Sequence, residues 1–124
     1  MHVLIVDDDL GQAQLLGQLL AHDGITSTAV ASEAEALAAL AVQRSDVAIL
    51  DLGMPGLDGN ELLGRLRERS SGLPAILVTG WPERDPRVAA FLERGGTAYL
   101  AKPVVPSKLL ALLARLAAAA GADE

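Results

Sequence analysis

Short runs of apolar residues alternate along this chain with longer segments in which apolar residues recur at helical spacing. Val3–Val6 is the first all-apolar run, and Leu10–His22 follows it with leucines at positions 16, 19 and 20. A short run of this kind is typical of a strand buried on both faces, whereas a spacing of three and four residues is typical of a helix. The alternation occurs five times, with β-branched residues marking the second strand at Ile25–Val30, so the pattern predicts five strand–helix units.

Turn and capping residues set the expected limits of these units. The expected strands are Val3–Val6, Ile25–Val30, Val47–Leu50, Ala75–Val78 and Thr97–Leu100. The expected helices are Leu10–His22, a segment capped by Ser32 and running to about Gln43, Asn60–Arg69, Pro82–Glu93, and a segment from Pro106 to about Ala120. Gly53, Pro55, Gly56 and Gly59 predict a loop. Regular alternation of strands and helices implies an α/β protein with a parallel sheet, right-handed crossovers and helices on both faces.

Polar residues fall where the apolar runs end. Asp7, Asp8, Asp51, Thr79 and Lys102 all lie at the ends of expected strands or just after them. Strand ends of a parallel sheet meet at one edge, which is where such folds bind ligands. A carboxylate there is costly unless it is paired, and three converging carboxylates suit a hard cation such as Mg²⁺. The pattern therefore predicts a magnesium site at this edge.

Composition narrows the class of protein. The 124 residues fit one domain, which we place at residues 1–120 with a short tail at 121–124. The chain is 51% hydrophobic but only 2% aromatic, so its core must be aliphatic. A net charge of −6 argues against direct binding of nucleic acid, and the lack of cysteine excludes disulfides and thiolate metal sites. Neither a signal peptide nor a membrane-spanning stretch is evident, so a cytoplasmic protein is expected.

Taken in order, these motifs give the chain a family resemblance. The acidic pair Asp7-Asp8, the segment DLGMPGLDG that starts at Asp51, Thr79 in ILVTG, and Lys102-Pro103 in YLAKP follow successive strands. Together they resemble the receiver domain of two-component response regulators along the whole chain. The resemblance implies a flavodoxin-like (βα)5 fold with strand order 2-1-3-4-5 and a cis peptide bond before Pro103.

The resemblance also implies a role for each site residue. Asp51 is the expected phosphoacceptor, which would form an acyl phosphate. Asp8, Asp51 and the backbone carbonyl of Gly53 are the expected Mg²⁺ ligands, with Asp7 acting through a water or as a second ligand. Thr79 and Lys102 would contact phosphoryl oxygens, and Tyr99 would be the aromatic switch residue. The function implied is a phosphorylation-dependent signalling switch, regulatory rather than enzymatic, with intrinsic autophosphorylation and autodephosphorylation.

Several of these residues also have a simpler interpretation. The aspartates after the first strand could cap the first helix, and for Asp9 this is the preferred interpretation. Asp58 is better explained as the cap of the third helix than as a ligand. Tyr99 could be an ordinary core residue. Trp81 flanks the site and either shields the acyl phosphate from water or leans on the loop surface.

Partners follow from the same resemblance. The phosphodonor would be a histidine kinase or a histidine phosphotransfer domain, docking on Gln12, Leu15, Pro103 and Val104. In the last helix, one set of leucines is expected to face the core: Leu109, Leu112, Leu113 and Leu116. An outer stripe of Leu110, Ala114 and Ala117 could support a homodimer or could reflect helix propensity alone.

Two other function classes compete with the signalling switch. A Mg²⁺-dependent phosphatase of the haloacid-dehalogenase kind also uses an aspartyl phosphate, but it needs a second Asp where this chain has Gly53. A phosphorylation-independent binding module on the same fold would be expected to lack an acidic residue or the lysine, and both are present.

Overall fold

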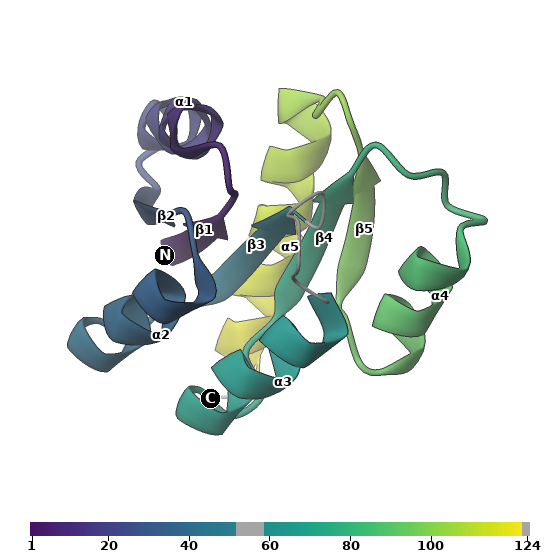
Figure 1. Cartoon of the computed structure of the whole chain (residues 1–124). Helices are drawn as coiled ribbons and strands as arrows, with labels where there is room; N and C mark the ends of the chain where they lie inside the picture. The colour runs from purple at the N-terminus through teal and green to yellow at the C-terminus, as the bar shows by residue number, and fades with distance from the viewer. Residues whose placement is uncertain (52–58, 123–124) are drawn as a thin grey trace.

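Five parallel strands form one sheet with helices on both sides (Figure 1). The computed structural model describes residues 1–51 and 59–122. The strands are β1 (His2–Val6), β2 (Thr26–Val30), β3 (Val47–Asp51), β4 (Ala75–Thr79) and β5 (Ala98–Ala101). The helices are α1 (Leu10–Ala21), α2 (Glu33–Val42), α3 (Gly59–Arg69), α4 (Pro86–Glu93) and α5 (Pro106–Ala122). In the described ranges, no helix has the length and apolar character needed to cross a membrane.

The sheet has the order β2-β1-β3-β4-β5, and every pair of neighbours is parallel. This confirms the predicted flavodoxin-like α/β fold. Chain order reverses at β1, between β2 and β3. In doubly wound sheets, ligands bind beyond the carboxyl ends of the strands near such a reversal. The fold thus places the ends of β1 and β3 at its most favourable ligand site.

Two aliphatic cores lie on opposite faces of the sheet. On one face, alternate strand residues such as Leu4, Leu50 and Leu77 pack with Leu66 of α3 and Phe91 of α4. On the other face, the intervening residues pack with α1 and α5, and this core includes Val3, Ile5, Ile49, Ile76, Leu109 and Leu113. Successive strand residues point to opposite faces, so an all-apolar strand serves both cores. This arrangement explains why the central strands β1, β3 and β4 are buried along their length and carry apolar runs, whereas the edge strand β2, with the sequence TSTAV, does not.

Two helix starts follow the predicted capping chemistry. The Asp9 carboxylate accepts a hydrogen bond from the backbone N–H of Gln12 and caps α1, as expected. Ser32 caps α2 by accepting from the backbone N–H of Glu35, whose own carboxylate accepts from the backbone N–H of Ala31. Ser32 thus satisfies one backbone donor of the first helical turn. Glu35 reaches one residue further back than the reciprocal bond of a capping box, which goes to the N–H of the cap residue.

The predicted start of α4 was wrong by four residues. The helix begins at Pro86 rather than Pro82, because Asp85 is its N-cap and Pro86 fills the first helical position. Pro82 instead accepts a turn hydrogen bond from the backbone N–H of Asp85. Strand limits differ less: β5 runs over Ala98–Ala101, one residue later than expected. Thr97 precedes it and accepts, through its hydroxyl oxygen, a hydrogen bond from the backbone N–H of Ala75.

The last helix packs much as predicted. Leu109, Leu112 and Leu113 are buried against the α1–α5 core, and Leu116 is half-buried on it. The expected outer stripe is only partly correct, because Leu110 also packs against this core. Ala114 and Ala117 are exposed.

Candidate functional site

Strand register brings the chemistry-bearing residues to one edge of the sheet. Val6 of β1 lies opposite Leu50 of β3, so Asp7 and Asp51 occupy adjacent positions. Asp51 in turn pairs with Val78 of β4, one residue before Thr79. Thr79 pairs with Ala101 of β5, and its carbonyl accepts a hydrogen bond from the backbone N–H of Lys102. The predicted clustering of these residues follows directly from the register.

Three carboxylates lie together at this edge. One oxygen from each of Asp7, Asp8 and Asp51 lies within 4.8 Å of the others. Asp7 and Asp51 are buried, whereas Asp8 is exposed. The Asp7 carboxylate also accepts a hydrogen bond from the backbone N–H of Asp9, at 2.9 Å. Clustered carboxylate oxygens that are partly open to solvent fit the ligand preference of Mg²⁺, which keeps several waters.

Burial changes the titration of Asp7. Loss of hydration raises the pKa of this carboxyl to about 6, and the negative charge of Asp51 acts in the same direction. The hydrogen bond from Asp9 and the positive charge of Lys102 oppose the rise in pKa without cancelling it. A bound cation would favour the ionised carboxylate and reverse the shift. Burial therefore disfavours the ionised form of Asp7 despite the nearby charge of Lys102.

Lys102 supplies one positive charge. Its Nζ lies 2.5 Å from Oδ2 of Asp51 and donates a hydrogen bond to it. Burial alone would lower the pKa of the Lys102 ammonium, but the hydrogen bond and charge of Asp51 outweigh this and the pKa is raised. The lysine is thus held in its charged form against the residue predicted to accept a phosphoryl group.

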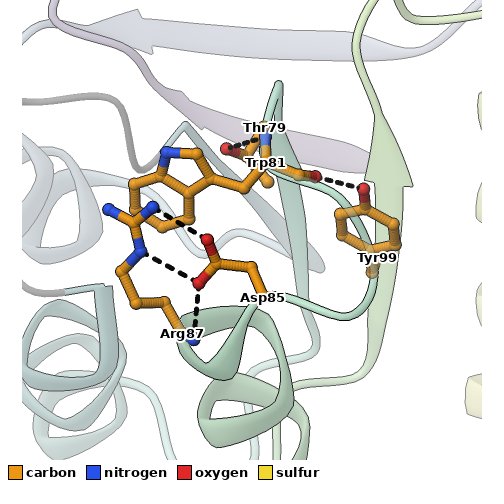
Figure 2. A network of polar contacts seen from close by, with 5 residues as sticks. All are labelled: Thr79, Trp81, Asp85, Arg87 and Tyr99. Carbon is orange, nitrogen blue, oxygen red and sulfur yellow. Dashed lines mark hydrogen bonds and ion pairs between the residues drawn. The ribbon is translucent and has the colours of Figure 1, made fainter.

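Thr79 and Tyr99 are connected through Trp81 (Figure 2). The Thr79 hydroxyl oxygen accepts a hydrogen bond from the backbone N–H of Trp81 at 3.2 Å, which leaves its hydroxyl hydrogen for another acceptor. The Tyr99 hydroxyl donates to the backbone carbonyl of Trp81 at 2.5 Å. Thr79 is buried, and Tyr99 is half-buried on the core beneath α4. The two predicted switch residues therefore share one neighbour.

The Trp81 ring contacts Arg87, which in turn pairs with Asp85, and neither of these two residues was predicted from the sequence. The guanidinium of Arg87 lies over the indole, 3.3 Å from its centroid, and Asp85 binds that guanidinium. Asp85-Pro86 is a signal that could have located this region, because an aspartate cap followed by proline marks a helix start. The guanidinium–indole contact had no comparable local signal. Whether Trp81 also shields an acyl phosphate stays a prediction.

A cleft of about 400 Å³ opens beside the site, between α1 and the segment that follows β5. Three of the four predicted docking residues line it, namely Gln12, Leu15 and Val104, as do Asp51 and Lys102. Leu15 is 65% exposed, unusually high for a leucine beside an apolar cleft. Pro103, the fourth, is exposed and follows a cis peptide bond, as the resemblance implied.

Three expectations lie outside the described residues. They are the loop at Gly53, Pro55 and Gly56, the carbonyl of Gly53 as a metal ligand, and Asp58 as the cap of α3.

Comparison with known proteins places this chain in one family. The family model described as the response regulator receiver domain matches residues 3–114. This chain therefore belongs to the response regulator receiver domains, which are regulatory phosphoacceptor modules. The predicted resemblance is confirmed over nearly the whole chain.

Individual relatives agree with this assignment. The "Uncharacterized 14.6 kDa protein in sodA1 3'region" of Leptolyngbya boryana is 39% identical over 115 residues, covering 91% of this chain and 87% of that protein. The DNA-binding transcriptional regulator NtrC of Escherichia coli K12 is 38% identical over 113 residues, which is 91% of this chain but only 24% of NtrC. This chain thus spans about a quarter of NtrC.

Solved structures agree as well. A CheY-like response regulator receiver domain from Methanospirillum hungatei has a TM-score of 0.82 and 31% identity, covering 92% of this chain and 90% of that one. A response regulator from Chloroflexus aurantiacus has a TM-score of 0.81 and 34% identity, covering 94% of this chain and 97% of that one.

Proposed function

We propose that this protein is a phosphorylation-dependent signalling switch in which Asp51 accepts a phosphoryl group from a phosphohistidine donor. One observation carries the proposal. Asp51 is buried at the end of β3, with two further carboxylates within 4.8 Å and the Lys102 ammonium 2.5 Å from its Oδ2. Family membership implies a histidine kinase as partner.

The chemistry requires charge to be neutralised at this edge. An Asp51 oxygen attacks phosphorus as the phosphorus–nitrogen bond of the donor breaks, and the donor imidazole leaves with the electron pair and takes up a proton. The product is an acyl phosphate on Asp51. Lys102 moves its contact from the carboxylate to a phosphoryl oxygen, where it acts as a point charge. A bound Mg²⁺ would supply further positive charge for the transferring group.

The three carboxylates would share the metal. Asp8 and Asp51 serve as direct ligands, and Asp7 acts through a water or as a second ligand. The exposure of Asp8 would leave the site open to the waters that Mg²⁺ keeps when it binds. A carbonyl from Gly53 completes the predicted set.

The conformational response would start at Thr79. The phosphoryl group adds roughly −1.5 to −2 charge at neutral pH, and the Thr79 hydroxyl can donate a hydrogen bond to it. Because the Trp81 amide is bonded to the Thr79 hydroxyl, a shift of Thr79 carries Trp81 and the loop with it. Tyr99 is bonded to the same loop, so it would move with it and remodel the face formed by α4, β5 and α5.

The phosphodonor would dock over the cleft between α1 and the segment after β5. Gln12, Leu15, Pro103 and Val104 are the proposed contacts. An exposed leucine beside an apolar cleft that opens onto Asp51 supports this location. The output regulated by the switch would be a separate partner or an attached domain, in a cytoplasmic setting. A homodimer through the outer face of α5 stays a prediction, as do intrinsic autophosphorylation and autodephosphorylation.

Intact mass measurement tests the proposal. The protein is incubated with Mg²⁺ and a small-molecule phosphodonor, and we expect a mass increase of one phosphoryl group. Asp51→Asn should abolish the increase, whereas Asp23→Asn, an exposed aspartate in the turn after α1, should leave it intact. An unchanged increase in Asp51→Asn would place the acceptor on another residue. No increase in the wild-type protein would refute the switch itself.

A further inference from the structure

Trp81 is held at three points, and only two of them belong to the expected switch. Its backbone amide and carbonyl are bonded to Thr79 and Tyr99, as described above. The third point is the ring, which lies under the guanidinium of Arg87 at 3.3 Å from the indole centroid (Figure 2). Neither Arg87 nor Asp85 lines the cleft beside Asp51. Arg87 lies outside the site and fixes the ring of Trp81. Trp81 is also the residue that Thr79 and Tyr99 both contact.

Asp85 orients the guanidinium. Arg87 donates from Nε to Oδ1 of Asp85 at 3.0 Å and from Nη2 to Oδ2 at 2.9 Å. These two parallel hydrogen bonds form a fork that fixes the plane of the guanidinium, so that its face can lie on the indole. A lysine could supply the charge but neither the fork nor the flat contact.

Helix capping alone does not account for these contacts. Asp85 caps α4 by accepting a hydrogen bond from the backbone N–H of Arg87 at 2.9 Å. That bond requires nothing from the Arg87 side chain. The side-chain fork and the indole contact are additional, and both act on the loop at residues 80–85.

We propose that Arg87 and Asp85 form a latch on Trp81 that holds loop 80–85 in its resting conformation. The latch thereby raises the free energy needed to reach the phosphorylated conformation. This inference rests on the proposed function. A movement of Thr79 toward a phosphoryl group carries the Trp81 backbone with it, and the ring must then leave the guanidinium or strain its own backbone. The latch stabilises only the resting arrangement, and an interaction present in one of two states shifts the equilibrium toward that state. Arg87 is therefore a positioning residue that acts through Trp81.

Quenching of Trp81 fluorescence tests the latch in the resting protein. Trp81 is the only tryptophan in the sequence, so its emission reports this ring alone. In metal-free, unphosphorylated protein, Arg87→Gln should raise acrylamide quenching. Asp85→Asn should raise it too, because asparagine preserves the cap but lacks the charged fork. Arg84→Gln removes an exposed arginine of the same loop and should change nothing. Unchanged quenching in Arg87→Gln would overturn the latch.

A titration with beryllium fluoride, a mimic of the phosphoryl group, tests the effect on switching. With Mg²⁺ present, the midpoint of the Trp81 fluorescence change should fall about 2- to 5-fold in Arg87→Gln, which matches the loss of one exposed cation–π contact. The midpoints of Asp85→Asn and Arg87→Lys should move in the same direction, and that of Arg84→Gln should match wild type.

Equal midpoints in wild type and Arg87→Gln, with intact phosphorylation of Asp51, would overturn the latch while leaving the proposed function standing. A wild-type protein that gains no phosphoryl mass would instead overturn the proposed function, and the regulatory role of the latch with it.

Discussion

Single residues at the end of the sheet carry charges that the fold alone cannot stabilise. Asp7 and Asp51 are buried at neighbouring strand ends, and Lys102 neutralises only one of them directly. Burying like charges costs free energy unless they are paired or protonated. The raised pKa of Asp7 is the measurable sign of that cost.

The Asp7 carboxyl should make the metal-free protein more stable in mild acid. Its pKa is raised to about 6 in the folded state, above the ordinary value near 3.8. The folded state therefore holds this proton more tightly, and the stabilisation is complete below about pH 4 and lost as the pH rises through 6. After allowance for solvent screening, we expect a gain of about 1 kcal/mol on going from pH 7 to pH 5.

Urea denaturation in the presence of a chelator measures this gain. Asp7→Asn should remove it, because the amide does not titrate. Asp23→Asn, in the exposed turn after α1, should retain it. The same gain in Asp7→Asn would assign the pH dependence to another group.

At the scale of elements, close backbone contacts decide which glycines are required. The turn between α4 and β5 contains Gly95, whose φ of +98° lies in the region that favours glycine. A Cβ built on the next residue, Gly96, would lie 2.2 Å from ring carbons of Phe91 and 2.7 Å from the Phe91 carbonyl oxygen. Phe91 is fully buried and cannot move aside without disrupting the core. By contrast, a Cβ on Gly64 in α3 would meet no neighbour within 4 Å.

Replacing Gly96 or Gly64 by alanine should have opposite effects on stability. Gly96→Ala should destabilise the protein by about 1–3 kcal/mol through overpacking against Phe91. Gly64→Ala should stabilise it by about 0.5–1 kcal/mol, because alanine is the better helix former. Urea denaturation of both variants checks the signs. A Gly96→Ala protein as stable as wild type would mean that the turn relaxes freely around Phe91.

In the whole molecule, one sheet separates two aliphatic cores. The carboxylates of Asp7, Asp8 and Asp51 lie at the carboxyl edge of this sheet. Positive charge bound at that edge should stabilise the entire domain, because binding to the folded state alone shifts the folding equilibrium by mass action. Free Mg²⁺ at 100 times its dissociation constant should add about 2.7 kcal/mol. For a domain of this size, the melting temperature should rise by roughly 5–10 °C.

Thermal unfolding with and without Mg²⁺ measures this shift, with sodium chloride at matched ionic strength as the salt control. Asp8→Asn should lose most of the Mg²⁺ shift, since Asp8 is one of the three clustered carboxylates. Asp23→Asn should keep it. A shift of equal size in Asp8→Asn would show that Mg²⁺ stabilises the protein elsewhere.

The pattern of apolar and β-branched residues by itself determined the five strands, the burial of the three central strands on both faces and the parallel sheet, because the period and length of such runs are local properties of the chain. Asp7, Asp8, Asp51, Thr79 and Lys102 could be assigned to one edge for the same reason, since strand ends must meet there. The start of α4 was misplaced because Pro82 and Pro86 both suit a first helical turn. The local signal for the second was Asp85, which directly precedes Pro86 and caps the helix. The stacking of Arg87 on Trp81, the rise in the Asp7 pKa and the cleft beside α1 were decided by the tertiary structure alone. Each depends on distances between side chains, or on the extent of burial, and spacing along the sequence fixes neither.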